Sequence, residues 1–146
     1  MPSVRLERTE ARPIAAVRRS SFRQALGRDI IESLDTVWPV LRAQQVIAGH
    51  NVVVYHGGLE DLEIGVEVLS PFEETAEVRL SATPAGEVAV ATHWGDYAAM
   101  MPAYAALERW FEESGRRRTG VSWEVYGDWA EEPSERRTDI YFLISS

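Results

Sequence analysis

One order of elements occurs twice in this sequence, and the repeat constrains the fold more than any other feature. In each half the spacing of apolar residues predicts two strands, a helix and two further strands. Residues Arg12–Val17 correspond to Ala85–Val90, and Gly49–Gly57 corresponds to the run that ends at Gly127. This order indicates that the chain is duplicated and consists of two similar halves.

The length of the chain sets the number of domains that we expect. At 146 residues it can bury about two-thirds of its unfolded surface in one core. We therefore expect a single α+β domain over residues 1–146, with repeat halves at approximately 1–72 and 73–146.

Eight strands are predicted from β-branched and alternating apolar residues. They are Val4–Glu10, Ile14–Arg18, Asn51–Tyr55, Leu62–Val68, Val78–Ala82, Glu87–His93, Val121–Gly127 and Thr138–Ile144. Arg12-Pro13 lies between the first two strands and Pro84-Ala85-Gly86 lies between the fifth and sixth. Both are typical turn sequences, so we expect each of these two pairs to form a hairpin.

The first helix is predicted from about Asp29, where apolar residues begin to recur at three- and four-residue spacing. Pro39 removes a backbone donor and clashes with the carbonyl four residues before it, so we expect a kink or a break near Asp35. Gly49 is expected to close the helical region.

The second helix is predicted to follow Asp96, a residue type that caps helices. Its apolar stripe runs from Tyr97 to Phe111, and Ser114-Gly115 is expected to end it.

Glu124 is the most informative polar residue because it stands in a predicted strand between aromatic residues. Strand alternation places Ser122, Glu124 and Tyr126 on one face. Aligning the repeats on Tyr55 and Tyr126 places Val53 at the position of Glu124, so the strand does not need an acid there. We interpret Glu124 as a functional carboxylate in a cavity; a solvated glutamate on an edge strand is the alternative.

Composition excludes several classes of function. The chain has no cysteine, and all 15 of its basic residues are arginine, which excludes disulfides, thiolate chemistry and lysine Schiff bases. A net charge of -8 disfavours nucleic acids and anionic membranes as partners. The N-terminus lacks the apolar run of a signal peptide and no stretch could span a membrane, so we expect a cytoplasmic protein.

Neither a metal nor a cofactor is predicted. His50, His56 and His93 lack the close spacing of metal ligands. No glycine-rich phosphate loop leads from a strand into a helix, so nucleotide binding has no support.

Nearly the whole chain resembles a known family, the GyrI-like small-molecule-binding domain, also called the AraC-type effector-binding or multidrug-binding domain. The resemblance rests on an ordered set of residues: Pro84-Ala85-Gly86, His93-Trp94-Gly95-Asp96-Tyr97, Tyr104, Leu107, Trp110, Glu124 and Tyr126. It implies duplicated strand–helix–strand–strand modules with pseudo-two-fold symmetry, an antiparallel sheet with two main helices, and a central ligand cleft.

The same resemblance implies a set of site residues. It places Glu124 at the floor of the cleft among aromatic residues, with Asp139 and Tyr141 as further lining. Tyr126 shares the face of Glu124, and its repeat partner Tyr55 is a candidate on the opposite wall. Three further aromatic candidates have a weaker basis, because aromatic residues on helix stripes are more often core. They are Trp38, Trp94 and Tyr97.

Three functions follow for a stand-alone member of such a family. The first is binding of apolar aromatic, often cationic, molecules for multidrug or toxin sequestration. The second is hydrolysis of cyclopropane-bearing genotoxins with Glu124 as the catalytic acid or base. The third and weakest is inhibition of DNA gyrase, with the acidic loop Asp128–Glu135 as a mimic of DNA.

Overall fold

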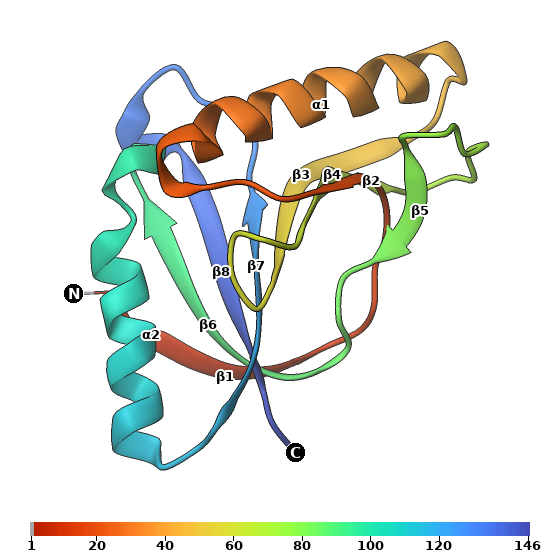
Figure 1. Cartoon of the computed structure of the whole chain (residues 1–146). Coiled ribbons are helices and arrows are strands. Elements are labelled where there is room, and N and C mark those ends of the chain that lie inside the picture. The colour runs from red at the N-terminus through yellow and green to blue at the C-terminus, as the bar shows by residue number, and fades with distance from the viewer. Residues whose placement is uncertain (1) are drawn as a thin grey trace.

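The computed structural model describes residues 2–146, which form one antiparallel sheet and two main helices (Figure 1). The strands are β1 Val4–Thr9, β2 Pro13–Arg19, β3 Ala48–His56, β4 Leu62–Val68, β5 Arg79–Ala82, β6 Gly86–Trp94, β7 Arg118–Tyr126 and β8 Arg137–Ile144. The helices are α1 Leu26–Ala43 and α2 Met101–Ser114, with the short 3₁₀ turns η1 Arg23–Ala25, η2 Tyr97–Ala99 and η3 Pro133–Glu135. The predicted α+β class is confirmed.

The order of the strands, β1-β6-β8-β7-β3-β4-β2-β5, displays the duplication. Exchanging each strand with its counterpart in the other half returns the same order read from the opposite edge. The pseudo-two-fold axis therefore passes between β3 and β7. At this junction Val53 lies directly opposite Glu124, and these are the two residues that the repeat alignment equates.

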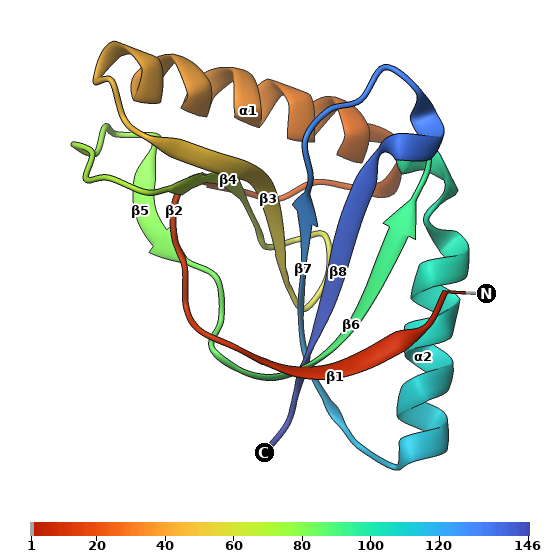
Figure 2. The same ribbon diagram turned by 180° about the vertical axis from the view of Figure 1, so that it is seen from behind.

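The two hairpins predicted from turn residues are wrong. β1 pairs with β6, whereas β2 pairs with β4 and β5, so each half lends its first strand to the sheet edge of the other half. Figure 2 shows β1 and β5 far apart at the two ends of the curved sheet. The pairing follows tertiary burial, because Val4 of β1 packs against the core beneath α2.

The chain crosses itself where these two strands leave their own halves. The backbone N–H of Thr83 donates to the carbonyl of Arg12 at 2.9 Å, and the N–H of Arg12 donates to Thr83 Oγ1 at 3.0 Å. The backbone N–H groups of Arg12 and Thr83, which would lie in the turns of the two predicted hairpins, therefore bond to each other's segment instead.

The predicted break in the first helix is also wrong, since α1 is continuous through Pro39. Asp35 and Pro39 are both exposed, so water can hydrate the carbonyl that the proline leaves without a donor. Gly49 does not close the helix but lies in β3; the chain leaves α1 through Gln45, which takes a left-handed φ of 56°. α2 ends as predicted, at Gly115 with φ 70°.

Both helices cover the face of the sheet that carries Glu124. α2 packs on Ile140, Phe142 and the alanines of β6, and α1 packs on the apolar residues of β2 and β4. On the other face the sheet curls, so that side chains of β2 and β6 meet Trp123 in a core without a helix. No helix within residues 2–146 is both long and apolar enough to cross a membrane.

Gly65 marks the closest approach of β4 to β2 and gives a test of this packing. A Cβ at Gly65 would lie 1.9 Å from the carbonyl oxygen of Ala15. We expect Gly65→Ala to lower the free energy of unfolding by about 3 kcal/mol or more, because backbone rather than a movable side chain must give way. Urea denaturation measures the change.

Gly27→Ala is the control: a Cβ at Gly27 in α1 meets nothing within 4 Å, so this variant should be neutral or more stable by up to about 1 kcal/mol. Equal effects of the two changes would contradict the β2–β4 packing.

Candidate functional site

A cleft of about 730 Å³ lies over the central strands, between the N-terminal ends of α1 and α2. Its walls are mainly apolar and aromatic. They include Leu26 and Ile30 of α1, and Tyr97, Met100, Met101 and Tyr104 in and before α2. Its floor is formed by Tyr55 of β3 and by Ser122, Glu124 and Tyr126 of β7. The cleft therefore lies on the pseudo-two-fold axis, where the two halves meet.

Glu124 is the centre of the floor and is only 3% exposed. The hydroxyl of Tyr55 donates to its Oε1 at 3.0 Å, and the hydroxyl of Tyr126 donates to the same oxygen. The hydroxyl of Tyr104 donates to Oε2. Within residues 2–146, no arginine or histidine forms an ion pair with Glu124. Three phenols thus hold a buried carboxylate that has no counter-charge in the described chain.

The duplication explains how two of these phenols reach one oxygen. Tyr55 and Tyr126 occupy equivalent positions on β3 and β7, and Glu124 stands at the axis between them. Tyr104 comes from α2 and approaches the other oxygen, so it breaks the symmetry. An ionised carboxylate only accepts hydrogen bonds and has about four acceptor positions, of which the three phenols use three.

The three phenols remain protonated donors at neutral pH. Burial raises the pKa of Tyr55, Tyr104 and Tyr126 above the ordinary tyrosine value, and the nearby charge of Glu124 raises it further. Each ring is therefore a fixed neutral wall whose hydroxyl is directed at the carboxylate.

Tyr97 forms part of the mouth of the cleft. Its ring meets the ring of Tyr126 edge to face, with centroids 5.5 Å apart. The guanidinium of Arg136 lies over Tyr97 at 5.9 Å and over Trp129 at 5.1 Å. These contacts connect the loop between β7 and β8 to the mouth of the cleft.

Four of the eight predicted site residues meet in this cleft: Glu124, Tyr126, Tyr55 and Tyr97. Their contact with a ligand stays a prediction. The other four, Asp139, Tyr141, Trp94 and Trp38, lie elsewhere.

The expectation that Asp139 and Tyr141 share the cleft with Glu124 is wrong. The residue opposite Glu124 on β8 is Ile140, and paired residues of antiparallel strands share a face. Asp139 and Tyr141, on either side of Ile140, therefore face the opposite side of the sheet.

Trp94 and Trp38 are also outside the cleft. Trp94 is 57% exposed at the end of β6, with Arg137 over its ring at 5.6 Å. Trp38 packs with the core beneath α1, and its indole N–H donates to Asn51 Oδ1 at 2.9 Å.

Tyr104 is the functional candidate that the sequence-based choice of site residues omitted. It was recognised as part of the apolar stripe of the second helix, where aromatic residues usually pack in the core. Its hydroxyl was the available signal, because a buried phenol needs a hydrogen-bond partner.

The histidines do not gather with acids into a metal site. Within residues 2–146, no group of three His, Cys, Asp or Glu side chains could hold a metal ion. His56 Nε2 lies 2.7 Å from Glu63 Oε1, His93 Nε2 lies 2.8 Å from the carbonyl of Asp96, and His50 Nε2 lies 3.0 Å from Asp128 Oδ1.

Comparison with protein families identifies the kind of domain. The model of the GyrI-like small molecule binding domain matches residues 57–145. A comparison with curated protein sequences finds no match.

Several solved structures share the fold. The EcmrR C-terminal domain is 18% identical, with a TM-score of 0.79 over 100% of this chain and 99% of its own. SAV2435 bound to tetraphenylphosphonium is 10% identical, with a TM-score of 0.64 over 99% of this chain and 94% of its own. A protein described as a hydrolase from Listeria innocua is 10% identical, with a TM-score of 0.64 over 98% and 92% of the two chains.

Tyr104→Phe tests the hydrogen bonding of Glu124. Removing this hydroxyl leaves Oε2 without its donor, so the free energy of unfolding should fall by about 1–3 kcal/mol. Urea denaturation measures it. Tyr97→Phe is the matched control, because Tyr97 lines the same cleft without a hydrogen bond to Glu124; it should change stability by less than about 0.5 kcal/mol. Equal losses in the two variants would show that the Tyr104 hydroxyl does not support the carboxylate.

The raised phenol pKa values predict that stability declines at high pH. Above about pH 10 the unfolded chain releases its tyrosine protons while the folded chain keeps those of Tyr55, Tyr104 and Tyr126. The unfolded state then binds fewer protons, so the free energy of unfolding falls by up to about 1.4 kcal/mol per pH unit for each phenol. Unfolding between about pH 9 and 11 measures the slope, which Tyr104→Phe should reduce. Tyrosinate absorbance from these residues in the folded protein near pH 10 would contradict the prediction.

Proposed function

Because the chain belongs to the GyrI-like small-molecule-binding family, we propose that it captures apolar aromatic, often cationic, molecules in the cleft above Glu124. The observation that carries this proposal is a buried carboxylate with no basic partner in residues 2–146, lying beneath an apolar and aromatic cleft. A cationic ligand would supply the missing opposite charge.

Physical chemistry favours a delocalised cation over a small, strongly hydrated one. Three phenols already occupy most acceptor positions of Glu124, so a ligand need not donate a hydrogen bond to it. Attraction then acts through charge and through the faces of the aromatic rings. Such forces do not require one hydrogen-bonding pattern, which suits a site with several ligands.

The walls support ligands of differing shape. Met100 and Met101 at the start of α2 have flexible side chains that adapt to irregular surfaces. The volume of about 730 Å³ is within the usual range for drug-sized ligands. Arg23 at the rim is exposed, and in the described structure it makes no ion pair with Glu124. SAV2435, which shares this fold, is bound to tetraphenylphosphonium, an aromatic cation of the proposed class.

The biological role that we propose is sequestration of toxic or drug-like molecules in the cytoplasm by a chain that acts as one domain over residues 1–146.

DNA gyrase inhibition has less support. Within the loop that was considered as a DNA mimic, the guanidinium of Arg136 donates to the backbone carbonyls of Ala130 and Glu131, which places a cation beside the acids.

Glu124→Gln tests the electrostatic part of the proposal. The change keeps the size of the side chain and removes its charge, so we expect tetraphenylphosphonium to bind about 5- to 150-fold more weakly, equivalent to about 1–3 kcal/mol. Isothermal titration calorimetry measures the affinity. Triphenylphosphine oxide, which is neutral, should bind both proteins equally.

Glu60→Gln is the matched control for net charge. Glu60 is exposed in the loop after β3, so its charge is screened by salt. This variant should bind tetraphenylphosphonium within about twofold of the original. If Glu124→Gln also stays within that limit, the buried charge does not drive binding.

Hydrolysis is the second candidate, favoured by the meeting of three phenol donors at one acid. When water attacks the cyclopropane and its C–C bond breaks, a phenol can protonate the carbonyl oxygen of the substrate. The same hydrogen bonds weaken Glu124 as a base, because its lone pairs are already engaged. We therefore rank hydrolysis below binding.

The test of hydrolysis is incubation with a duocarmycin-type spirocyclopropane, followed by mass spectrometry for a gain of water. Equal rates for the original protein and Glu124→Gln would remove the hydrolase candidate.

A further inference from the structure

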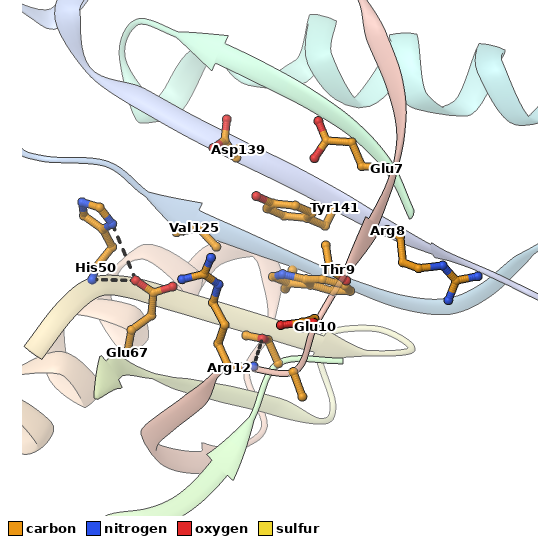
Figure 3. A pocket seen from close by; sticks show the side chains of 13 residues that line it. Glu7, Arg8, Thr9, Glu10, Arg12, His50, Glu67, Val125, Asp139 and Tyr141 are labelled. Atoms are coloured by element: carbon orange, nitrogen blue, oxygen red, sulfur yellow. Dashed lines mark hydrogen bonds and ion pairs between the residues drawn. The ribbon is translucent and has the colours of Figure 1, made fainter. Parts of the chain in front are cut away.

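A second cavity, of about 800 Å³, lies on the opposite face of the sheet from Glu124 (Figure 3). Its lining comes from β1, from the segment between β1 and β2, and from β3, β4, β7 and β8. Trp123 lines this cavity, and its neighbour Glu124 lines the other, so adjacent residues of β7 serve opposite faces. The proposed ligand cleft does not use this cavity.

The floor of the second cavity contains a donor, the indole N–H of Trp123, with no acceptor in the described chain. Trp123 is 2% exposed and stacks on Tyr141, with ring centroids 5.1 Å apart and planes 4° apart. Its indole N–H has no hydrogen-bond partner in the described chain, whereas that of Trp38 has one. Within residues 2–146, Thr138 Oγ1 is the only solvent-inaccessible side-chain nitrogen or oxygen without a hydrogen-bond partner. The Trp123 Nε1 is therefore not fully shielded from solvent, and because Trp123 lines this cavity, a ligand oxygen there could accept from it.

Arg12 supplies a cation on the same side. Its backbone is fixed at the crossing with Thr83, and Figure 3 shows its side chain extending from there over the pocket, whereas Arg8 points away. Within residues 2–146, no carboxylate lies within ion-pair distance of Arg12. Arg12 and the Trp123 N–H together suit a carboxylate.

Glu67 supplies the opposite charge. It is 9% exposed, and the backbone N–H of His50 donates to its Oε1 at 2.9 Å. Gly49 makes room for it, since a Cβ there would lie 2.8 Å from the same oxygen. No arginine pairs with Glu67, whose Oε1 lies 3.6 Å from His50 Nδ1. Of the other acids that line the cavity, Glu7 pairs with Arg5 and Asp139 with Arg137, whereas the exposed Glu10 forms no ion pair within residues 2–146.

We propose that this cavity binds a small zwitterion, an amino acid or a short peptide. Its carboxylate accepts from Arg12 and from the Trp123 N–H, and its ammonium donates to Glu67. Glu67 would repel a simple anion, and Arg12 would repel a simple cation, so a ligand that carries both charges is the one that satisfies the groups present.

The experiment follows the indole N–H signals of the full chain by ¹H–¹⁵N NMR. The chain has five tryptophans. The signal that disappears in Trp123→Phe is the one that belongs to the indole N–H of Trp123. Free phenylalanine and the tripeptide Ala-Phe-Ala are titrated separately, so that the two sources of the zwitterion are distinguished. We expect at least one of them to shift the Trp123 signal.

Capped tripeptides test the two charges. N-acetyl-Ala-Phe-Ala lacks the ammonium and Ala-Phe-Ala amide lacks the carboxylate, so each should bind at least about tenfold more weakly than the zwitterion. If neither zwitterion shifts the Trp123 signal up to about 10 mM, or if both capped peptides bind as well as the uncapped one, the proposal is overturned.

Two variants separate this site from general effects and from the Glu124 cleft. Arg12→Ala removes an exposed side chain and should weaken zwitterion binding at least about tenfold, whereas Arg117→Ala, also exposed but remote from the cavity, should not. Glu124→Gln should leave zwitterion binding unchanged even if tetraphenylphosphonium binding is lost. Equal effects of Arg12→Ala and Arg117→Ala would also overturn the assignment.

Discussion

The pairing of β3 with β7 is the interaction on which the rest of the structure depends. It joins the central strands of the two halves, and it places Val53 opposite Glu124 on the pseudo-two-fold axis. The backbone near this axis occurs in two related copies, so a single side chain there can be reached from both halves. That is how Tyr55 and Tyr126, from different strands, donate to one oxygen.

The same axis explains why the repeats differ at this position. Two carboxylates directly opposite each other on neighbouring strands would repel, and burial would increase the cost. One acid facing one valine avoids this repulsion and leaves a single charge at the centre of the floor. The cost of burying that charge is offset by three phenol donors, one of which, Tyr104, exists only in the second half. The functional asymmetry is thus built on a nearly symmetric sheet.

Local pattern was enough to predict the strands, the duplication and the face that Glu124 shares with Tyr126, because alternation and repeat alignment depend only on the sequence nearby. It failed where the partner of a strand is decided by tertiary burial. The turn at Arg12-Pro13 resembles a hairpin turn, yet β1 pairs with β6, where Val4 is partly buried against the core beneath α2. Asp139 and Tyr141 were placed in the wrong cavity for a related reason, since the face of β8 is set by its register with β7, which puts Ile140 opposite Glu124. Pro39 was judged without knowing that its side of α1 is exposed to water.

Strand β7 carries a polar group on each face, and each group lies beside a cavity. Glu124 is satisfied from within the protein by phenols, whereas the indole N–H of Trp123 is left without an acceptor. Their side chains leave the strand in opposite directions and share no partner, so a substitution at one should affect the other only through movement of β7 itself. Such movement is restricted, because β7 is hydrogen-bonded to β3 on one side and to β8 on the other. One rigid strand can therefore separate the two proposed ligand sites, so that a ligand in one need not affect the other.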